Sequence, residues 1–203
     1  MDTNLSEQKN KIKVAFIGDI GVGKTMIFMR VNNLLKNKLD CNNEERFISQ
    51  KEELLLTTNN GCLIQEKEII LENKDECILE IWDISNTQKT MRFNRFPITR
   101  KFHSAKDAQI IIFFVEPRRD NSLEMLKLLY DIYKIRADIN AIIVLSITKC
   151  DLNYSEEEIN DFKIFAKDNK MELVCSSAFS KEYGLEDEVF KELIKKYNQN
   201  IKK

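Results

Sequence analysis

The segment that most constrains the fold is the glycine-rich stretch Gly18-Asp19-Ile20-Gly21-Val22-Gly23-Lys24-Thr25, which holds three of the five glycines in the chain. It matches G-x-x-x-x-G-K-[ST] and lies between a predicted strand, Lys11–Ile17, and a predicted helix, Lys24–Leu35. In that setting the glycines let several backbone N–H groups face one anion. The segment therefore predicts a phosphate-binding loop, with Lys24 on the β- and γ-phosphates and the Thr25 hydroxyl on Mg²⁺. The alternative is a glycine-rich turn with a chance Lys-Thr pair.

Beyond this loop, strand-like and helix-like segments alternate along the chain. Strands are predicted at Leu63–Leu71, Cys77–Trp82, Gln109–Val115, Ala141–Ile147 and Met171–Cys175, the first two as a hairpin. Helices are predicted at about 122–136 behind the cap Asp120-Asn121-Ser122, at 156–168 behind a Ser155–Glu158 capping box, and over the apolar stripe Leu185, Val189, Phe190, Leu193, Ile194 and Tyr197. This alternation indicates an α/β fold, a three-layer P-loop sandwich with a mostly parallel six-stranded sheet and about five helices. We expect one domain at 11–197, with a flexible extension at 1–10 and a short polar tail at 198–203.

Composition excludes several classes of protein. The 203 residues carry 32 basic and 33 acidic side chains, so binding of nucleic acid through bulk charge is not expected. No apolar run approaches the ~20 residues of a membrane helix, and the N-terminus lacks a secretory signal. Five scattered cysteines, no C-x-x-C pair and the single His103 disfavour a zinc site and favour reduced thiols. We therefore expect a cytoplasmic protein.

A second motif predicts which base is bound. Thr148-Lys149-Cys150-Asp151, followed by Leu152, comes directly after a predicted buried strand. The Asp151 carboxylate can accept two hydrogen bonds from the N1–H and 2-amino group of guanine, a donor pair that adenine lacks. The Lys149 stem can lie along the base. A solvated loop after a strand is the alternative.

Two further segments fit the same site by their positions. Asp83 ends a predicted strand, where its carboxylate would hold Mg²⁺ through water. Ser176-Ser177-Ala178 follows the last short strand, where backbone N–H groups would contact the guanine oxygen.

These residues in this order resemble the Ras-like small GTPases, from about Lys11 to Tyr197. GDIGVGKT, the strand ending in Trp-Asp and KCDL look most like the Rab group, whereas TKCD and CSSAF are also similar to Rho proteins. About twenty residues separate Leu152 from Val174, too few for the extra helix of Rho proteins, so a divergent Rab-like member is the better interpretation. The resemblance implies GTP/GDP and Mg²⁺ as ligands, and a switch that acts in vesicle trafficking or related signalling.

The motifs and the resemblance together define the predicted site. In addition to residues 18–25, GTP is expected to contact Met26, Thr58, Asp83, Asn86, Thr148, Lys149, Asp151, Leu152, Ser177, Ala178 and Phe179. Mg²⁺ is expected at Thr25, Thr58 and, through water, Asp83. Thr57 is an alternative to Thr58, which sits better relative to the following strand. The 33 residues from Thr25 to Thr58 exceed the usual spacing of the family, and either a neutral insertion or a partner-specific role explains them.

The departures from the family pattern concern hydrolysis. Asn86 stands where the family has the glycine that meets the γ-phosphate, and Thr87 where it has the water-orienting Gln. Ile20 occupies a loop position where bulky side chains usually obstruct hydrolysis. Unassisted Ras-type hydrolysis is already only ~10⁻⁴ per second, so we expect very slow intrinsic turnover, with Gln88 as the rescuing catalytic residue if the loop shifts by one position.

Two functions therefore remain open: a GTP/GDP switch with slow GTPase activity, and a pseudo-GTPase that serves as an interaction module. An adenine-nucleotide kinase is disfavoured by TKCD and by the absence of an arginine-rich lid.

Expected partners are effectors, exchange factors and GTPase-activating proteins at the two switches, with the protein itself a monomer. In the second switch, between residues 88 and 106, cations alternate with phenylalanines. We favour phenylalanines packed under the switch with solvated cations, and the alternative is an effector-binding or acidic-membrane surface. The C-terminus has no cysteine for prenylation, so membrane association is expected only through partners at endomembranes, unless the sequence is truncated.

Overall fold

The computed structural model describes residues 10–32, 62–84, 105–180 and 182–202. Its centre is a six-stranded sheet in the order β2-β3-β1-β4-β5-β6. The strands are β1 (Asn10–Gly18), β2 (Leu63–Ile70), β3 (Glu76–Asp83), β4 (Ile110–Val115), β5 (Ile142–Ile147) and β6 (Glu172–Cys175). Only the β2–β3 pair is antiparallel. The predicted hairpin and the mostly parallel sheet are therefore confirmed.

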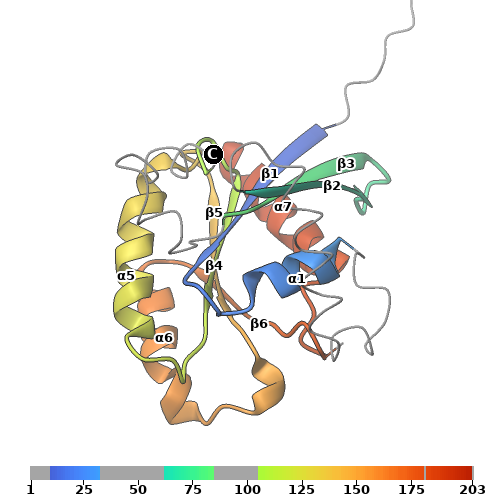
Figure 1. The fold of residues 1–203 in the computed structure, drawn as a ribbon. Coiled ribbons are helices and arrows are strands. Elements are labelled where there is room, and N and C mark those ends of the chain that lie inside the picture. Colours follow the sequence, from blue (N-terminus) through green and yellow to red (C-terminus); the bar gives the residue numbers. More distant parts are fainter. Residues whose placement is uncertain (1–9, 33–61, 85–104, 181, 203) are drawn as a thin grey trace, which may run out of the picture.

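Helices cover both faces of this sheet. The α-helices are α1 (Lys24–Val31), α5 (Ser122–Tyr133), α6 (Glu156–Asp168) and α7 (Asp187–Ile201), and two 3₁₀ helices are η2 (Lys134–Arg136) and η3 (Cys150–Leu152). In Figure 1, α5 and α6 lie on one side of the sheet, and α1 and α7 on the other. The described residues thus hold four α-helices where the sequence predicted about five. The three-layer α/β architecture is confirmed.

The alternation of side chains along β1 builds two cores. Val14 and Phe16 join the cluster that includes buried residues of α1 and α7, whereas Ala15 and Ile17 join the cluster beneath α5 and α6. Every residue of β4 is buried, as expected for a strand covered on both faces. The predicted stripe of the last helix packs into the first cluster, although Leu185 lies two residues before α7 begins.

The helix starts agree with the sequence in one case and differ in another. Ser155 caps α6 in a complete capping box, in which its hydroxyl accepts from Glu158 N and the Glu158 carboxylate accepts from Ser155 N. The side-chain cap predicted for α5 is wrong. Asn121 occupies the N-cap with φ 55° and makes no side-chain capping bond, because its left-handed backbone is not the extended conformation that capping side chains use.

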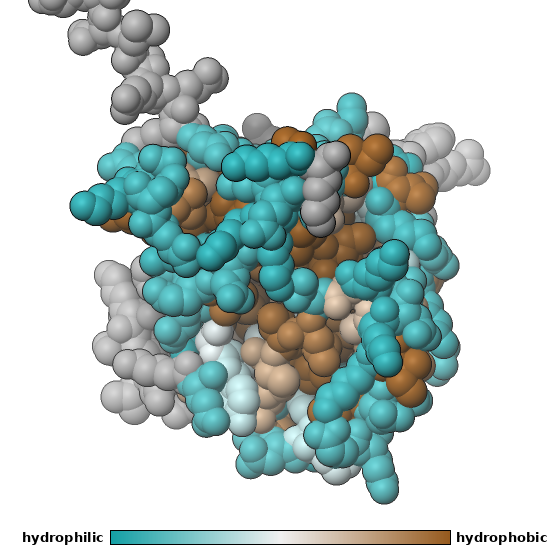
Figure 2. All heavy atoms as spheres, turned by 180° about the vertical axis from the view of Figure 1, so that it is seen from behind, coloured by the Kyte–Doolittle hydropathy of each residue, from teal (hydrophilic) through white to brown (hydrophobic). Residues whose placement is uncertain are grey.

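The surface is mainly polar. Seen from behind, hydrophilic side chains surround an area of apolar side chains near the middle of the face (Figure 2). None of the described helices combines the length and the apolar composition needed to cross a bilayer.

Candidate nucleotide-binding site

The loop between β1 and α1 has the geometry of an anion-binding turn. Gly21 and Gly23 adopt φ values of 81° and 95°, a backbone region that residues other than glycine rarely adopt. The backbone N–H groups from Ile20 to Gly23 donate no hydrogen bond to any described residue. They stand beside the start of α1, where the first helical N–H groups also lack intrahelical acceptors. The loop therefore presents a set of donors at the positive end of a helix dipole.

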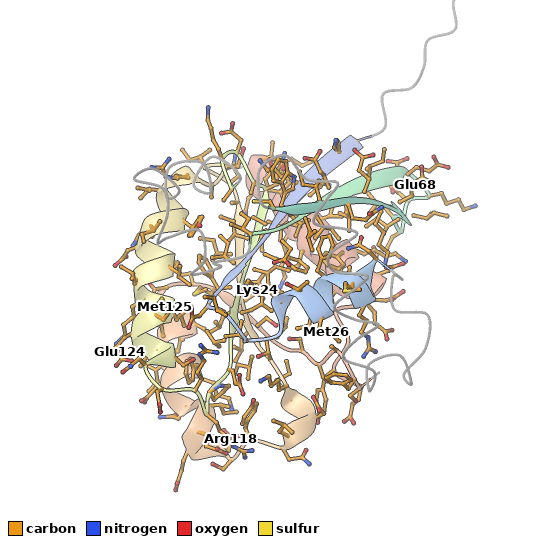
Figure 3. The ribbon with its side chains drawn as sticks, in the orientation of Figure 1. Lys24, Met26, Glu68, Arg118, Glu124 and Met125 are labelled. Carbon is orange, nitrogen blue, oxygen red and sulfur yellow. The ribbon has the colours of Figure 1, made fainter. Side chains whose placement is uncertain are left out.

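Lys24, the first residue of α1, lies inside this loop. Only 5% of its surface is exposed, and its Nζ donates to the Asp19 carbonyl oxygen at 2.7 Å. Figure 3 shows Lys24 at the start of α1, near the middle of the molecule. A buried cation is stable only with nearby negative or polar partners, and the Asp19 carbonyl oxygen is one such partner. The ammonium group adds a localised positive charge to the backbone donors of the loop.

Thr25 and Asp83 bring together two oxygen ligands from distant parts of the chain. Thr25 Oγ1 donates to Asp83 Oδ2 at 2.6 Å, and Asp83 is fully buried at the end of β3. A hydroxyl and a carboxylate suit Mg²⁺, which usually takes one or two protein oxygens and completes its shell with phosphates and water. The described residues contain no group of three or more His, Cys, Asp and Glu side chains that could hold a metal ion alone. The donor set therefore fits a metal bound together with phosphate.

The Thr148–Asp151 segment is anchored to the sheet. Both the backbone N–H and the hydroxyl of the buried Thr148 donate to the Val115 carbonyl oxygen, at 2.8 and 2.9 Å. Lys149 adopts φ 57°, and its Nζ donates to the Glu116 carboxylate at 2.7 Å. Asp151 lies exposed on η3, and its carboxylate makes no hydrogen bond or ion pair within the described ranges. The anchored segment thus presents an accessible carboxylate.

The Ser176–Ala178 segment lies against this one. Cys150 N donates to Ser176 O at 3.2 Å, and the Ser176 and Ser146 hydroxyls are 2.6 Å apart in the core. Ser177 Oγ accepts from the backbone N–H of Phe179 and of Ser180, at 3.0 and 3.1 Å. These bonds hold a tight turn after β6, so the two predicted guanine-contacting segments form adjacent loops.

Sequence reasoning missed two charged residues that follow β4. Arg119 Nε lies 3.3 Å from Asp19 Oδ2, and its guanidinium reaches a position 2.6 Å from where a Cβ on Gly21 would be. Glu116 forms the ion pair with Lys149. Their place directly after a predicted buried strand could have identified them as site residues. Side chains that follow parallel strands gather at the carboxyl edge of a sheet, where ligands bind.

The remaining predicted residues divide into two groups. Met26 and Ile20 are half-buried beside the loop, while Leu152 and Phe179 are 48% and 47% exposed near the guanine-side loops. Thr57, Thr58, Asn86, Thr87 and Gln88 lie outside the described residues, as does most of the predicted second switch. The structure therefore brings together the phosphate-loop, Asp83, Thr148–Leu152 and Ser177–Phe179 parts of the predicted site.

A parallel sheet with a glycine-rich loop and a buried lysine between β1 and α1 defines a P-loop nucleotide-binding protein. Comparison with known families makes this class more specific, since the sequence model of the Ras family matches residues 13–199. The chain belongs to the Ras family, whose members are small GTPases that bind guanine nucleotides. A comparison with curated proteins found no match.

Proposed function

We propose that this chain is a divergent, Rab-like GTP/GDP switch that binds its nucleotide with Mg²⁺ and hydrolyses GTP slowly. The observation that supports it most is the arrangement of three loops at one edge of the sheet. The loop after β1 offers Lys24 and backbone donors, the loop after β5 offers Asp151, and the loop after β6 lies against the loop after β5. This edge is where open α/β sheets bind ligands.

At the phosphate end, residues 20–23 would bind phosphate oxygens through their N–H groups, and Lys24 would contact the β- and γ-phosphates. Thr25 would donate its oxygen to Mg²⁺, and Asp83, now hydrogen-bonded to Thr25, would reach the metal through water. Bound Mg²⁺ supplies positive charge that offsets the negative charge of the phosphate oxygens.

At the base end, Asp151 would accept hydrogen bonds from N1–H and the 2-amino group of guanine. The anchoring of Thr148 on β4 and of Cys150 on Ser176 supports this role, because a pre-positioned acceptor loses little entropy on binding. Ser177 and Ala178 would face the guanine oxygen, and the Ala178 N–H donates to no described residue.

Slow hydrolysis is the part of the proposal that the loop composition supports. Ile20 is half-buried beside Gly21, and in the proposed complex its branched side chain would take up space that an attacking water and a partner's arginine need. The same residue favours the second candidate, a GTP-locked interaction module. Under either function, we propose that effectors, exchange factors or activating proteins bind the switch segments of a monomer, in the cytoplasm or at endomembranes, in vesicle trafficking or related signalling.

The proposal is tested by Asp151→Asn, with Asp161→Asn on the exposed face of α6 as the matched control. Asp151→Asn should bind GTP at least tenfold more weakly and xanthosine triphosphate more tightly, because the amide can donate to the xanthine oxygen. Asp161→Asn should change neither affinity. Unchanged GTP binding by Asp151→Asn would contradict the guanine assignment.

Single-turnover hydrolysis of preloaded GTP separates the two candidates. Release of phosphate over minutes to hours supports the switch, whereas GTP that persists in the protein for days supports the locked module. A protein that retains no guanine nucleotide after purification, and binds none on addition, would contradict both.

A further inference from the structure

The turn that carries Asp151 begins and ends in left-handed backbone. Lys149, directly before η3, and Asn153, directly after it, adopt φ values of 57° and 50°. Residues with a side chain rarely adopt this conformation, so neighbouring contacts have to hold it. The start of the turn is fixed to the sheet, because Thr148 donates twice to the Val115 carbonyl oxygen. The far end of the turn leaves the sheet and leads into α6, so its position depends on other contacts.

Arg118, in the loop after β4, supplies contacts at this far end. Its Nε and Nη2 donate to the two carboxylate oxygens of Glu158, at 2.5 and 3.1 Å, in a bidentate ion pair. Its Nη1 and Nη2 also donate to the carbonyl oxygens of Leu152 and Asn153, at 3.5 and 3.4 Å. The guanidinium lies over the Tyr154 ring, 4.9 Å from the ring centroid, at the lower end of the molecule in Figure 3. One side chain therefore contacts the chain from the end of η3 to the first turn of α6.

Glu158 is a fixed partner for this ion pair. Its carboxylate accepts from Ser155 N at 2.7 Å, so the capping box holds the side chain at the start of α6. This helix packs into the core through Phe162 and Ala166. A bidentate arginine–carboxylate pair fixes orientation as well as distance, because two N–H groups have to meet two oxygens. The position of the Arg118 guanidinium therefore follows that of α6.

Glu116, two residues before Arg118, contacts the other end of the turn. Its carboxylate accepts from Lys149 Nζ at 2.7 Å. Pro117 lies between Glu116 and Arg118 and restricts the backbone of this segment. The left-handed residues before and after η3 are thus both contacted by one short segment, and Asp151 lies between the two contacts.

We propose that Arg118 is a positioning residue for guanine recognition, which fixes η3 so that the Asp151 carboxylate meets both guanine donors at once. This inference rests on the proposed function, which places guanine at Asp151. Two donors, N1–H and the 2-amino group, need an acceptor whose two oxygens keep a fixed direction. The Arg118 side chain is 45% exposed, and exposed ion pairs contribute little to folding. Loss of Arg118 should therefore change base selection more than the free energy of unfolding.

Inosine diphosphate provides the measurement, because its base keeps N1–H but lacks the 2-amino group of guanine. The ratio of the dissociation constants for inosine diphosphate and GDP reports how well Asp151 contacts that group. The wild type should prefer GDP at least about tenfold, the value of one charged hydrogen bond. In Arg118→Ala we expect this preference to fall about three- to fivefold, the range that an exposed ion pair supports. Arg118→Lys should fall less, because lysine keeps the charge but loses the bidentate geometry.

Lys134→Ala is the matched control. It removes an exposed cation that likewise pairs with a carboxylate, that of Asp131, and lies over a tyrosine ring, that of Tyr130. Because Lys134 directly follows the other end of α5, the preference for GDP should stay at the wild-type value.

Hydrogen exchange tests the positioning without nucleotide. Leu152 N and Asn153 N donate to Lys149 O and Cys150 O within the turn, at 2.9 and 3.1 Å. These amides should exchange at least about threefold faster in Arg118→Ala, while the amides of β5 keep their wild-type rates. Faster exchange in β5 as well, together with equal losses of affinity for both nucleotides, would show a merely structural role and overturn the inference.

The outcomes separate this inference from the proposed function. A wild type that prefers GDP, with the same preference in Arg118→Ala, would overturn the role of Arg118 alone. A wild type that binds neither nucleotide, or both equally well, would contradict guanine recognition by Asp151 and the inference with it.

Discussion

Gly18→Ala is the substitution whose effect the structure defines most directly. A Cβ at Gly18 would lie 2.5 Å from the Phe114 carbonyl oxygen and 3.2 Å from Phe114 Cβ. Gly18 pairs with Phe114 across β1 and β4 in the middle of the sheet, and the Phe114 ring packs against Phe16 with centroids 4.8 Å apart. The obstacle is backbone, so no side-chain rotation relieves it, and the strands must separate.

Forced expansion of a packed core costs about 1–3 kcal/mol, and we expect the upper half of that range because backbone has to move. For a chain of this length each kcal/mol lowers the melting temperature by about 2–4 °C, so a loss of about 2 kcal/mol lowers it by about 4–8 °C. The added methyl group also lies 3.3 Å from Lys24 Cδ, so nucleotide affinity should fall as well.

Gly184→Ala is the matched control. Its Cβ would meet Glu186 Cγ at 3.0 Å and Arg30 Nη2 at 3.3 Å, and both belong to long side chains that can move aside. We expect its free energy of unfolding to change by less than about 0.5 kcal/mol. Urea unfolding without nucleotide measures both variants, since bound ligand would add its own stabilisation. Equal stability of the two variants would refute the steric argument.

Three further predictions concern side chains around the site. Arg119→Ala should speed GDP release several-fold because it removes the partner of Asp19 beside the phosphate loop. Lys134→Ala, which removes an ion pair with Asp131 on α5 instead, should leave the release rate nearly unchanged. Arg118 and the Ser155 N–H lower the pKa of Glu158 from 4.5 to about 2. The carboxylate therefore adds stability above the unfolded-state pKa, and the difference in urea midpoint between the wild type and Glu158→Gln should shrink as the pH falls from 4.5 toward 2. Thr25→Ala should weaken the Mg²⁺ dependence of nucleotide affinity at least tenfold, and retention of the wild-type dependence in a magnesium titration would exclude Thr25 as a ligand.

The sequence predicted those parts of the fold that local chemistry determines. The buried runs of β4 and β5, the hairpin and the Ser155–Glu158 capping box were all readable, because each depends on residues adjacent in the chain or on apolar content alone. The cap of α5 was not, because Asn121 can cap from an extended backbone or adopt a left-handed one, and the loop after β4 selects the second.

The sequence predicted those loops of the site that a single motif supplies. Lys24 and Asp151 lie on the loops that their motifs indicated. The sequence had placed Thr25 and Asp83 at one metal, and their side chains do meet. The Arg119–Asp19 contact was not predictable, since it joins residues 100 positions apart. Such pairs follow from strand order, and no local pattern marks them.

The two ends of the site are held in different ways, and this difference determines what a substitution disturbs. On the guanine side, Thr148 donates to Val115 O and Ser176 N donates to Ile147 O at 2.7 Å. The loops after β5 and β6 are therefore fixed to buried strands of the sheet. On the phosphate side, the loop shape depends on left-handed glycines and on the half-exposed Arg119–Asp19 pair. Buried hydrogen bonds contribute to folding, whereas exposed ion pairs contribute little to it. Substitutions that break the Thr148 or Ser176 hydrogen bonds should therefore mainly lower the free energy of unfolding. Loss of Arg119 should change nucleotide release with little change in stability.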